Sequence, residues 1–189
     1  MSNKGFTLIE LLAMLVVLGI LMVVSIPNIT GILDNQKENA IKEDAIRMTD
    51  KVKTLMATSK DMEKPKSDEC LLVTLDYLDL SEEMLKGPND ANYDRDDSFV
   101  VVTYVKNTGN AYESGYEYKY YVRLVEVDGT NKYGINFSSL EDINNKDIKV
   151  VDKINNSMGS GVNRNTLGLQ SVCSTITKCI NSGSGFVCS

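Results

Sequence analysis

The chain contains no histidine among its 189 residues. This excludes catalytic pairs in which an imidazole activates a serine or a cysteine, and it excludes metal sites that include histidine. The sequence also lacks the G-x-S-x-G elbow, the P-loop and the G-x-G-x-x-G turn. We therefore expect neither an enzyme nor a cofactor, and no residue stands out as catalytic.

Basic residues are also few, because 20 Lys and Arg stand against 26 Asp and Glu, which gives a net charge of −6. A protein that binds nucleic acid by neutralising phosphates needs a basic face, so no nucleic-acid partner is expected. With 42% hydrophobic and 24% charged residues, the composition is typical of a globular protein.

Residues 6–26 form an apolar run in which only Thr7, Glu10 and Ser25 are polar. As a helix this run is about 30 Å long, which matches the hydrocarbon core of a membrane. Lys4 precedes it and no basic residue follows until Lys37. The positive-inside rule therefore predicts a single-pass membrane protein with a cytoplasmic N-terminus. The following "VVSIPNITG" offers no A-x-A-like site for cleavage as a secretory signal.

Glu10 is out of place in such a helix. A carboxylate near one end of a membrane helix costs on the order of 1–3 kcal/mol, and an ionisable residue there calls for a partner of opposite charge. The nearest candidate is a positive charge on another chain.

The stretch "KGFTLIELL" resembles the processing signature of type IV prepilins and pseudopilins. It has a short basic leader, a glycine, an aromatic residue and a glutamate five positions after the glycine. The resemblance covers the first 25 to 30 residues, including Gly19 and Pro27. The short leader is similar to that of the type IVa branch. The resemblance to prepilins implies that prepilin peptidase removes residues 1–5. The cut falls between Gly5 and Phe6, and Phe6 becomes N-methylated.

The same resemblance implies roles for two further residues. Glu10 is the countercharge for the new α-amino group of Phe6 in an adjacent subunit, and this pair selects one axial register. Pro27 removes a backbone hydrogen bond, so we expect a kink or a local loss of helix there.

Apolar residues recur at helical spacing beyond the membrane segment, up to about residue 60, with charged residues between them. This pattern predicts one long N-terminal helix over about residues 6–60. Its first half, residues 6–27, is apolar on all sides and suits packing among copies. Its second half is one-sided and belongs to a globular head of residues 28–189.

The head contains strand-like runs at residues 98–107, 116–127, 132–137 and 147–154, joined by short polar turns. Such short connections predict antiparallel hairpins. A short strand and a brief helix capped at Asp79 or Ser81 precede them. The fold class is therefore α+β, a long helix packed on an antiparallel sheet, as the pilin resemblance also implies. Residues 98–124 are similar in texture to heads of pilins from Gram-positive bacteria. Tyr116, Tyr118 and Tyr120 are interpreted as half-buried strand packing.

The loop "NDANYDRDDS" places Asp90, Asn92 and Asp94 at the one-three-five spacing of a calcium loop. Arg95 stands where such loops have glycine, and Val101 stands where they have a glutamate. A solvated acidic loop is therefore favoured, with a calcium site as the alternative.

Four cysteines follow the membrane segment, on its exported side, where disulfides persist. They are Cys70, Cys173, Cys179 and Cys188. Two disulfides that hold the C-terminal tail are favoured, and the three possible pairings stay open. The alternative is a zinc site made by all four cysteines, although their spacing lacks the usual C-x₂₋₄-C pair.

The sequence thus predicts a structural subunit of a type IV pilus that sits in the membrane before assembly and in an extracellular pilus afterwards. Its expected partners are copies of itself, other pilins, prepilin peptidase and the pilus assembly machinery. Two alternatives remain. One is a pseudopilin of a type II secretion or DNA-uptake system, and the other is a membrane-anchored adhesive module that does not polymerise. The sequence does not choose between motility, adhesion and secretion as the role of the filament.

Overall fold

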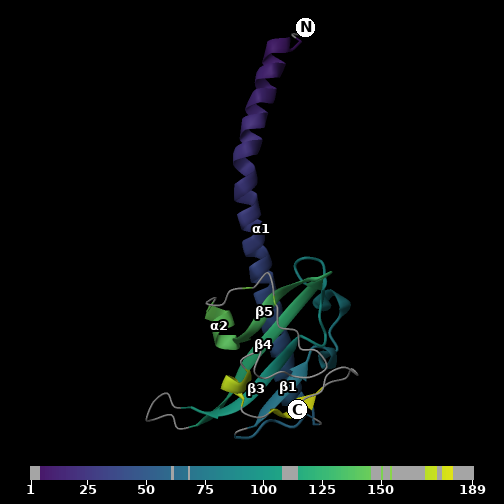
Figure 1. Cartoon of the computed structure of the whole chain (residues 1–189), viewed down its shortest axis with the longest axis vertical. Coiled ribbons are helices and arrows are strands. Elements are labelled where there is room, and N and C mark those ends of the chain that lie inside the picture. Colours follow the sequence, from purple (N-terminus) through teal and green to yellow (C-terminus); the bar gives the residue numbers. More distant parts are fainter. Residues whose placement is uncertain are drawn as a thin grey trace. The chain divides into compact units, whose positions relative to one another are not determined.

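The computed structural model describes residues 5–60, 62–67, 69–107, 115–145, 150, 154, 169–173 and 176–180. For residues 24–30, 169, 170 and 179 only the backbone is described. The chain divides into two compact units, Met1–Lys37 and Glu38–Ser189, which are treated separately below. Figure 1 labels the helices and strands.

The N-terminal helix α1 extends over Leu8–Thr58. It is slightly shorter at both ends than the helix predicted over about residues 6–60. A kink or a local loss of helix was predicted at Pro27. The backbone stays helical through this proline, so the local loss of helix is not present in the structure.

The head contains one six-stranded sheet with the strand order β2-β4-β3-β1-β6, and β5 pairs with the other side of β4. Its strands are β1 Cys70–Thr74, β2 Asn92–Tyr93, β3 Phe99–Lys106, β4 Tyr116–Asp128, β5 Asn131–Ser139 and β6 Ile176–Ile180. The pairs β1–β3, β3–β4 and β4–β5 are antiparallel, as the short turns predicted.

Strand β6 corrects the prediction of a purely antiparallel sheet, because it pairs with β1 in parallel. It belongs to the C-terminal tail, in which no strand was predicted. The tail approaches the free edge of β1 from far along the chain, so no tight turn forces it to run antiparallel. The predicted strand at 147–154 lies outside the described residues except for Val150 and Ile154, both of which are buried.

Short helices surround the sheet. The brief helix predicted after β1 is instead two 3₁₀ turns, Asp76–Leu78 and Glu82–Leu85. Ser81 precedes the second turn, as predicted, but its side chain makes no capping hydrogen bond. Helix α2, Leu140–Asn145, and helix α4, Leu169–Val172, were not predicted from the sequence. The start of α2 is capped by Ser139, whose Oγ accepts a hydrogen bond from the Asp142 backbone N–H at 3.1 Å.

One face of the sheet packs against the head portion of α1. The apolar stripe predicted on this part of the helix is confirmed, because its members are at most 4% exposed. They are Ile41, Ala45, Met48, Val52 and Met56. On the sheet they share one cluster with alternate residues of β1 and β3, namely Leu71, Val73, Val100 and Val102.

Tyr93 connects strand β2 to helix α1 through a hydrogen bond. Its hydroxyl donates a hydrogen bond of 2.7 Å to Oδ2 of Asp44 on α1. Burial raises the pKa of the Tyr93 phenol well above its ordinary value, and the neighbouring Asp44 carboxylate raises it further. The phenol therefore stays neutral and continues to donate this bond at any physiological pH.

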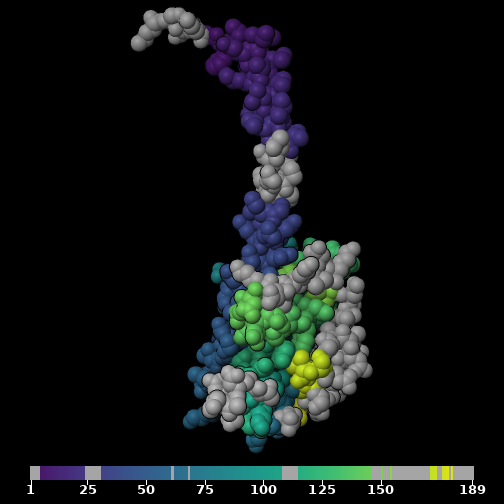
Figure 2. Space-filling view, turned by 90° about the vertical axis from the view of Figure 1, so that its left-hand side faces the viewer, coloured from purple at the N-terminus to yellow at the C-terminus, as the bar shows by residue number. Residues whose placement is uncertain are grey.

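The opposite face of the sheet carries a second, smaller core to which the C-terminal tail contributes. Its buried members are Cys70, Leu72, Phe99, Val101, Cys173 and Ile176. Figure 2 shows the described tail residues, coloured yellow, lying against strand residues coloured teal and green. Because the alternate side chains of β1 point to opposite faces, this short strand belongs to both cores.

A buried ion pair lies where β4 bulges against β5. Arg123 is fully buried and Asp97 is 1% exposed. The Nε and Nη2 atoms of Arg123 each donate a 3.0 Å hydrogen bond to a different carboxylate oxygen of Asp97. Lys132 adds a hydrogen bond of 2.8 Å to Asp97, and Nη1 of Arg123 donates to the Asn136 carbonyl at 2.8 Å. Both charges are thus compensated inside the head.

Candidate functional site

The first turn of α1 holds the residues that the sequence predicted to be processed. Gly5 and Phe6 are exposed, and residues 1–4 of the predicted leader lie outside the described residues. The scissile bond predicted between Gly5 and Phe6 therefore precedes the helix, which starts at Leu8. A peptide bond outside regular structure is accessible to a peptidase in extended form.

Glu10 forms a capping box with Thr7. Its Oε2 accepts hydrogen bonds from the Thr7 backbone N–H at 2.9 Å and from the Thr7 hydroxyl at 2.8 Å. In return, the Glu10 N–H donates to Oγ1 of Thr7 at 3.4 Å. The T-x-x-E spacing signals this motif, although Glu10 was predicted only as a countercharge. The box directs the carboxylate towards the start of the helix, where Phe6 lies.

The helix that follows presents apolar side chains on all sides. The large hydrophobic residues from Phe6 to Val23 are between 52% and 84% exposed. No other described segment covers them. A continuous apolar surface of this kind requires lipid or other protein chains as its environment.

Among the residues whose side chains are described, no helix combines the length and the mean hydropathy of a membrane span.

Residues 1–26 match the model of the prokaryotic N-terminal methylation motif. The chain carries a pilin-like N-terminal signal. This motif indicates a type IV pilin-like or pseudopilin precursor that is anchored in the membrane, and it implies processing by prepilin peptidase and assembly with other pilins. Proteins that carry this motif are structural rather than catalytic. No curated protein and no solved structure matches the chain.

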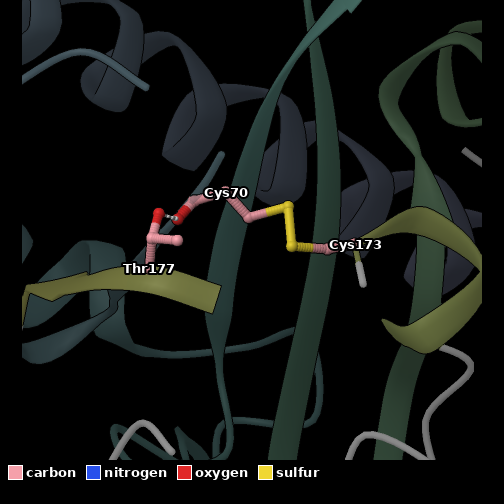
Figure 3. The surroundings of a disulfide bond; sticks show 3 residues. All are labelled: Cys70, Cys173 and Thr177. Carbon is pink, nitrogen blue, oxygen red and sulfur yellow. Dashed lines mark hydrogen bonds between the residues drawn. A yellow bond between two sulfur atoms is a disulfide. The ribbon is translucent and has the colours of Figure 1, made fainter. Parts of the chain in front are cut away.

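In this pilin-like chain, a disulfide between Cys70 and Cys173 links strand β1 to the C-terminal tail. The two Cα atoms are 6.1 Å apart although 103 positions separate them in the sequence. Figure 3 shows the bridge beside Thr177, whose hydroxyl donates a hydrogen bond of 3.3 Å to the Cys70 carbonyl. The predicted cysteine-linked tail is thus present.

The disulfide also decides between the alternatives for the four cysteines. A zinc site made by all of them is excluded, because Cys70 and Cys173 are no longer thiolates. The side chain of Cys179 and the whole of Cys188 lie outside the described residues. Once Cys70 and Cys173 are paired, Cys179 with Cys188 is the pairing left for the second predicted disulfide.

We expect a non-reducing peptide map to contain one linked peptide pair with Cys70 and Cys173. Reduction should raise the intact mass by about 4 Da if both predicted disulfides are present, because each bridge takes up two hydrogens. Replacing both Cys70 and Cys173 by alanine should lower the free energy of unfolding by about 2–5 kcal/mol, measured by urea titration. A peptide map that joins Cys70 to Cys179 or Cys188 would contradict this assignment.

The acidic loop has its own hydrogen bonds. Asp90 lies 3.3 Å from the Lys86 ammonium, and Oδ1 of Asp94 accepts bonds of 3.0 Å from the backbone N–H groups of Asp96 and Asp97. Asn92 is a residue of β2 and pairs with β4. In the described part of the chain, no three His, Cys, Asp or Glu side chains are grouped to hold a metal ion. The arrangement favours the solvated loop over a calcium site.

A buried carboxylate that the sequence analysis missed organises this loop. Glu126 of β4 is 1% exposed. Its Oε1 accepts hydrogen bonds from the backbone N–H groups of Asn89 at 2.9 Å and Ala91 at 3.2 Å. Gly87 approaches this carboxylate so closely that a Cβ there would lie 2.5 Å from its carbon. Glu126 therefore acts as an internal anchor of the loop and is not available to a ligand.

The tyrosines of β4 pack on their neighbours. The ring of Tyr104 on β3 lies 5.1 Å from that of Tyr116 and 4.7 Å from that of Tyr118, measured between centroids. Tyr118 and Tyr120 are half-buried against the main core, and Tyr116 is 50% exposed. The predicted half-buried packing is confirmed for Tyr118 and Tyr120 but is wrong for Tyr116, which is exposed.

Proposed function

We propose that the chain is a structural subunit of a type IV pilus. Residues 1–5 form the leader, and cleavage after Gly5 frees the α-amino group of Phe6, which is then methylated. Residues 6–27 form the segment that passes from the membrane into the filament core. Residues 28–189 form the head, which stays on the outside. The work of extraction from the membrane is done by other proteins, so the chain itself needs no catalytic residue.

The observation that carries this proposal is the methylation motif over residues 1–26, which contains the exposed apolar part of the helix. Outside the membrane, packing such a surface among copies of the same helix keeps it out of water, which is worth about 25 cal/mol for each Å² of apolar area. Within that apolar bundle, an unpaired charge is costly, so the Glu10 carboxylate takes the Phe6 amine of an adjacent copy as its partner. A stagger that separates these two groups is disfavoured, and the pair therefore fixes the axial register.

The experiment that tests the proposal is to shear filaments from the cell surface and identify the chain in the sheared fraction. A pilus subunit is expected there as a protein without its leader. Recovery only in the membrane fraction, with the leader removed, would instead favour a pseudopilin of a secretion or DNA-uptake system. Recovery in the membrane with the leader intact would favour an anchored adhesive module.

A further inference from the structure

A pocket of about 380 Å³ lies beside the Cys70–Cys173 disulfide in the head. Pockets that bind small molecules in proteins have volumes of about 300–1,000 Å³. Ser67 and Lys106 line the pocket and are exposed, so solvent reaches it. All of its lining residues belong to one compact unit, Glu38–Ser189. The pocket is therefore large enough and open enough to hold a small ligand.

Thr103 on β3 gives this pocket a polar group without a partner. The residue lines the pocket and is only 3% exposed. Among the side chains that the structure describes, its hydroxyl oxygen is the one buried polar atom that makes no hydrogen bond. By contrast, the buried hydroxyl of Thr49 donates to the Ala45 carbonyl at 2.9 Å. A buried hydroxyl without a partner is unfavourable, so an occupant of the pocket that pairs with it gains affinity.

The position of Thr103 allows its hydroxyl to meet such an occupant. Thr103 pairs directly with Cys70 on β1, and directly opposed residues of an antiparallel pair share one face of the sheet. The hydroxyl and the methyl group of threonine branch from the same carbon, and threonine adopts more than one staggered position about its Cα–Cβ bond. Rotation about this bond turns the hydroxyl towards the pocket without any movement of the strand.

The charged groups of the pocket favour a ligand without net charge. Among the described residues that line it, Glu69 is the one acid and Lys106 the one base. Oε2 of Glu69 accepts a hydrogen bond of 2.8 Å from the Lys66 backbone N–H, which holds this carboxylate in place. The carboxylate accepts hydrogen bonds, the ammonium donates them, and the hydroxyl of Ser67 does both. This combination matches a molecule that carries several neutral hydroxyl groups.

Tyr116 adds an aromatic surface to the same pocket. Its ring stacks on that of Tyr104, with the centroids 5.1 Å apart and the planes at 21°. Stacking holds the ring in one orientation, while the residue stays 50% exposed. The C–H groups of a pyranose carry partial positive charge and pack on the negative face of an aromatic ring. An exposed aromatic ring beside groups that bind hydroxyls is therefore typical of a saccharide site.

We propose that this pocket binds a neutral saccharide, with Thr103 hydrogen-bonding to a sugar hydroxyl and Tyr116 packing against the sugar ring. The inference goes beyond the proposed function and does not depend on it, because all the residues involved lie in the head. The two proposals therefore fail separately: sugar binding is measured on the purified chain, and assembly is measured on sheared filaments.

The test measures sugar binding by the purified full chain in a detergent whose headgroup contains no sugar. The probes are lactose, cellobiose, maltose and chitobiose, with sialyllactose as the charged comparison. Saturation-transfer NMR detects binding and titration calorimetry gives the Kd. Each disaccharide is offered both free and coupled to a polymer, which distinguishes a free sugar from a surface glycan as the source. We expect at least one neutral disaccharide to bind, and sialyllactose to bind no more tightly than lactose.

Substitutions at Thr103 separate recognition from folding. Thr103→Val keeps the shape of the side chain but removes the hydroxyl, so it should weaken sugar binding by about five- to tenfold. Because the unpaired hydroxyl is also removed from the head, the same variant should raise Tm by about 2–4 °C. Thr103→Ser keeps the hydroxyl and should bind within about twofold of the wild type. A residue needed only for packing would not show this opposition between affinity and stability.

Two further variants complete the comparison. Thr49→Val is the matched control, because it removes a buried hydroxyl that already has a partner outside the pocket. It should leave sugar binding unchanged and should not raise Tm. Tyr116→Ala alters an exposed position, so the head should stay folded, and the loss of the stacking surface should weaken binding by about tenfold.

Three results would overturn the inference. If none of the neutral disaccharides binds the wild-type chain, the pocket is not a saccharide site. If Thr103→Val or Tyr116→Ala binds sugar as tightly as the wild type, the sugar lies elsewhere on the chain. If Thr103→Val lowers Tm, the Thr103 hydroxyl has a partner in the folded head and needs none from a ligand.

Discussion

Replacing Glu10 by leucine is expected to abolish filament assembly while leader cleavage and membrane insertion continue. The substitution leaves the Phe6 amine of each adjacent copy without a counterion in an apolar bundle. Breaking a buried pair in this way costs about 3–5 kcal/mol, which corresponds to a loss of at least 100-fold in each contact. The measurement is the ratio of processed chain in the sheared filament fraction to processed chain in the membrane.

The capping box gives this experiment its control. Thr7→Val removes the hydroxyl that donates to Glu10 but leaves the Thr7 backbone N–H and the carboxylate in place. Loss of a helix cap costs about 1 kcal/mol, so assembly should fall only slightly. If both variants lose assembly equally, capping explains the role of Glu10. If Glu10→Leu assembles normally, the register function is wrong.

Replacing Arg123 by methionine is expected to lower the free energy of unfolding by about 3–5 kcal/mol. The substitution keeps most of the side-chain volume but leaves Asp97 in the core with Lys132 as its remaining cation. Urea titration of the detergent-solubilised protein measures the effect. Lys119→Met is the control on the same strand, because Lys119 pairs with Glu117 at the surface. That exposed pair should contribute less than about 1 kcal/mol.

The double variant Arg123→Met, Asp97→Leu distinguishes the cost of an orphaned charge from a need for the pair itself. Removing both charges leaves no unpaired carboxylate, so this variant should be more stable than Arg123→Met alone. The double variant can instead prove less stable than Arg123→Met alone. That result would show that the contacts of Asp97 with Lys132 and with its own loop contribute more to stability than its pairing with Arg123.

The sequence predicted the elements that depend on local periodicity. The long helix and strands β3, β4 and β5 follow from regular spacing of apolar residues, which is the signal that burial on one face imposes. The ends of α1 differ by two residues because the last turn of a helix depends on capping, and the Thr7–Glu10 box was not recognised.

The features that the sequence did not predict depend on contacts between distant residues. Strand β6 is only five residues long and mixes apolar with polar residues, so its sequence gives a weak signal. It forms because β1 offers it an edge and Cys173 brings the tail there. The pairing of Cys70 with Cys173 follows from folding, since spacing allows three pairings. Arg123 interrupts an apolar strand, and only the bulge against β5 and the position of Asp97 explain it.

The most direct test of the account is the mass of the N-terminal peptide of the chain recovered from sheared filaments. The account predicts a peptide that begins at Phe6, lacks Met1–Gly5 and carries one additional methyl group on its α-amino nitrogen. A peptide that still begins at Met1 or Ser2 would contradict it, because no α-amino group would then exist at Phe6 to pair with Glu10.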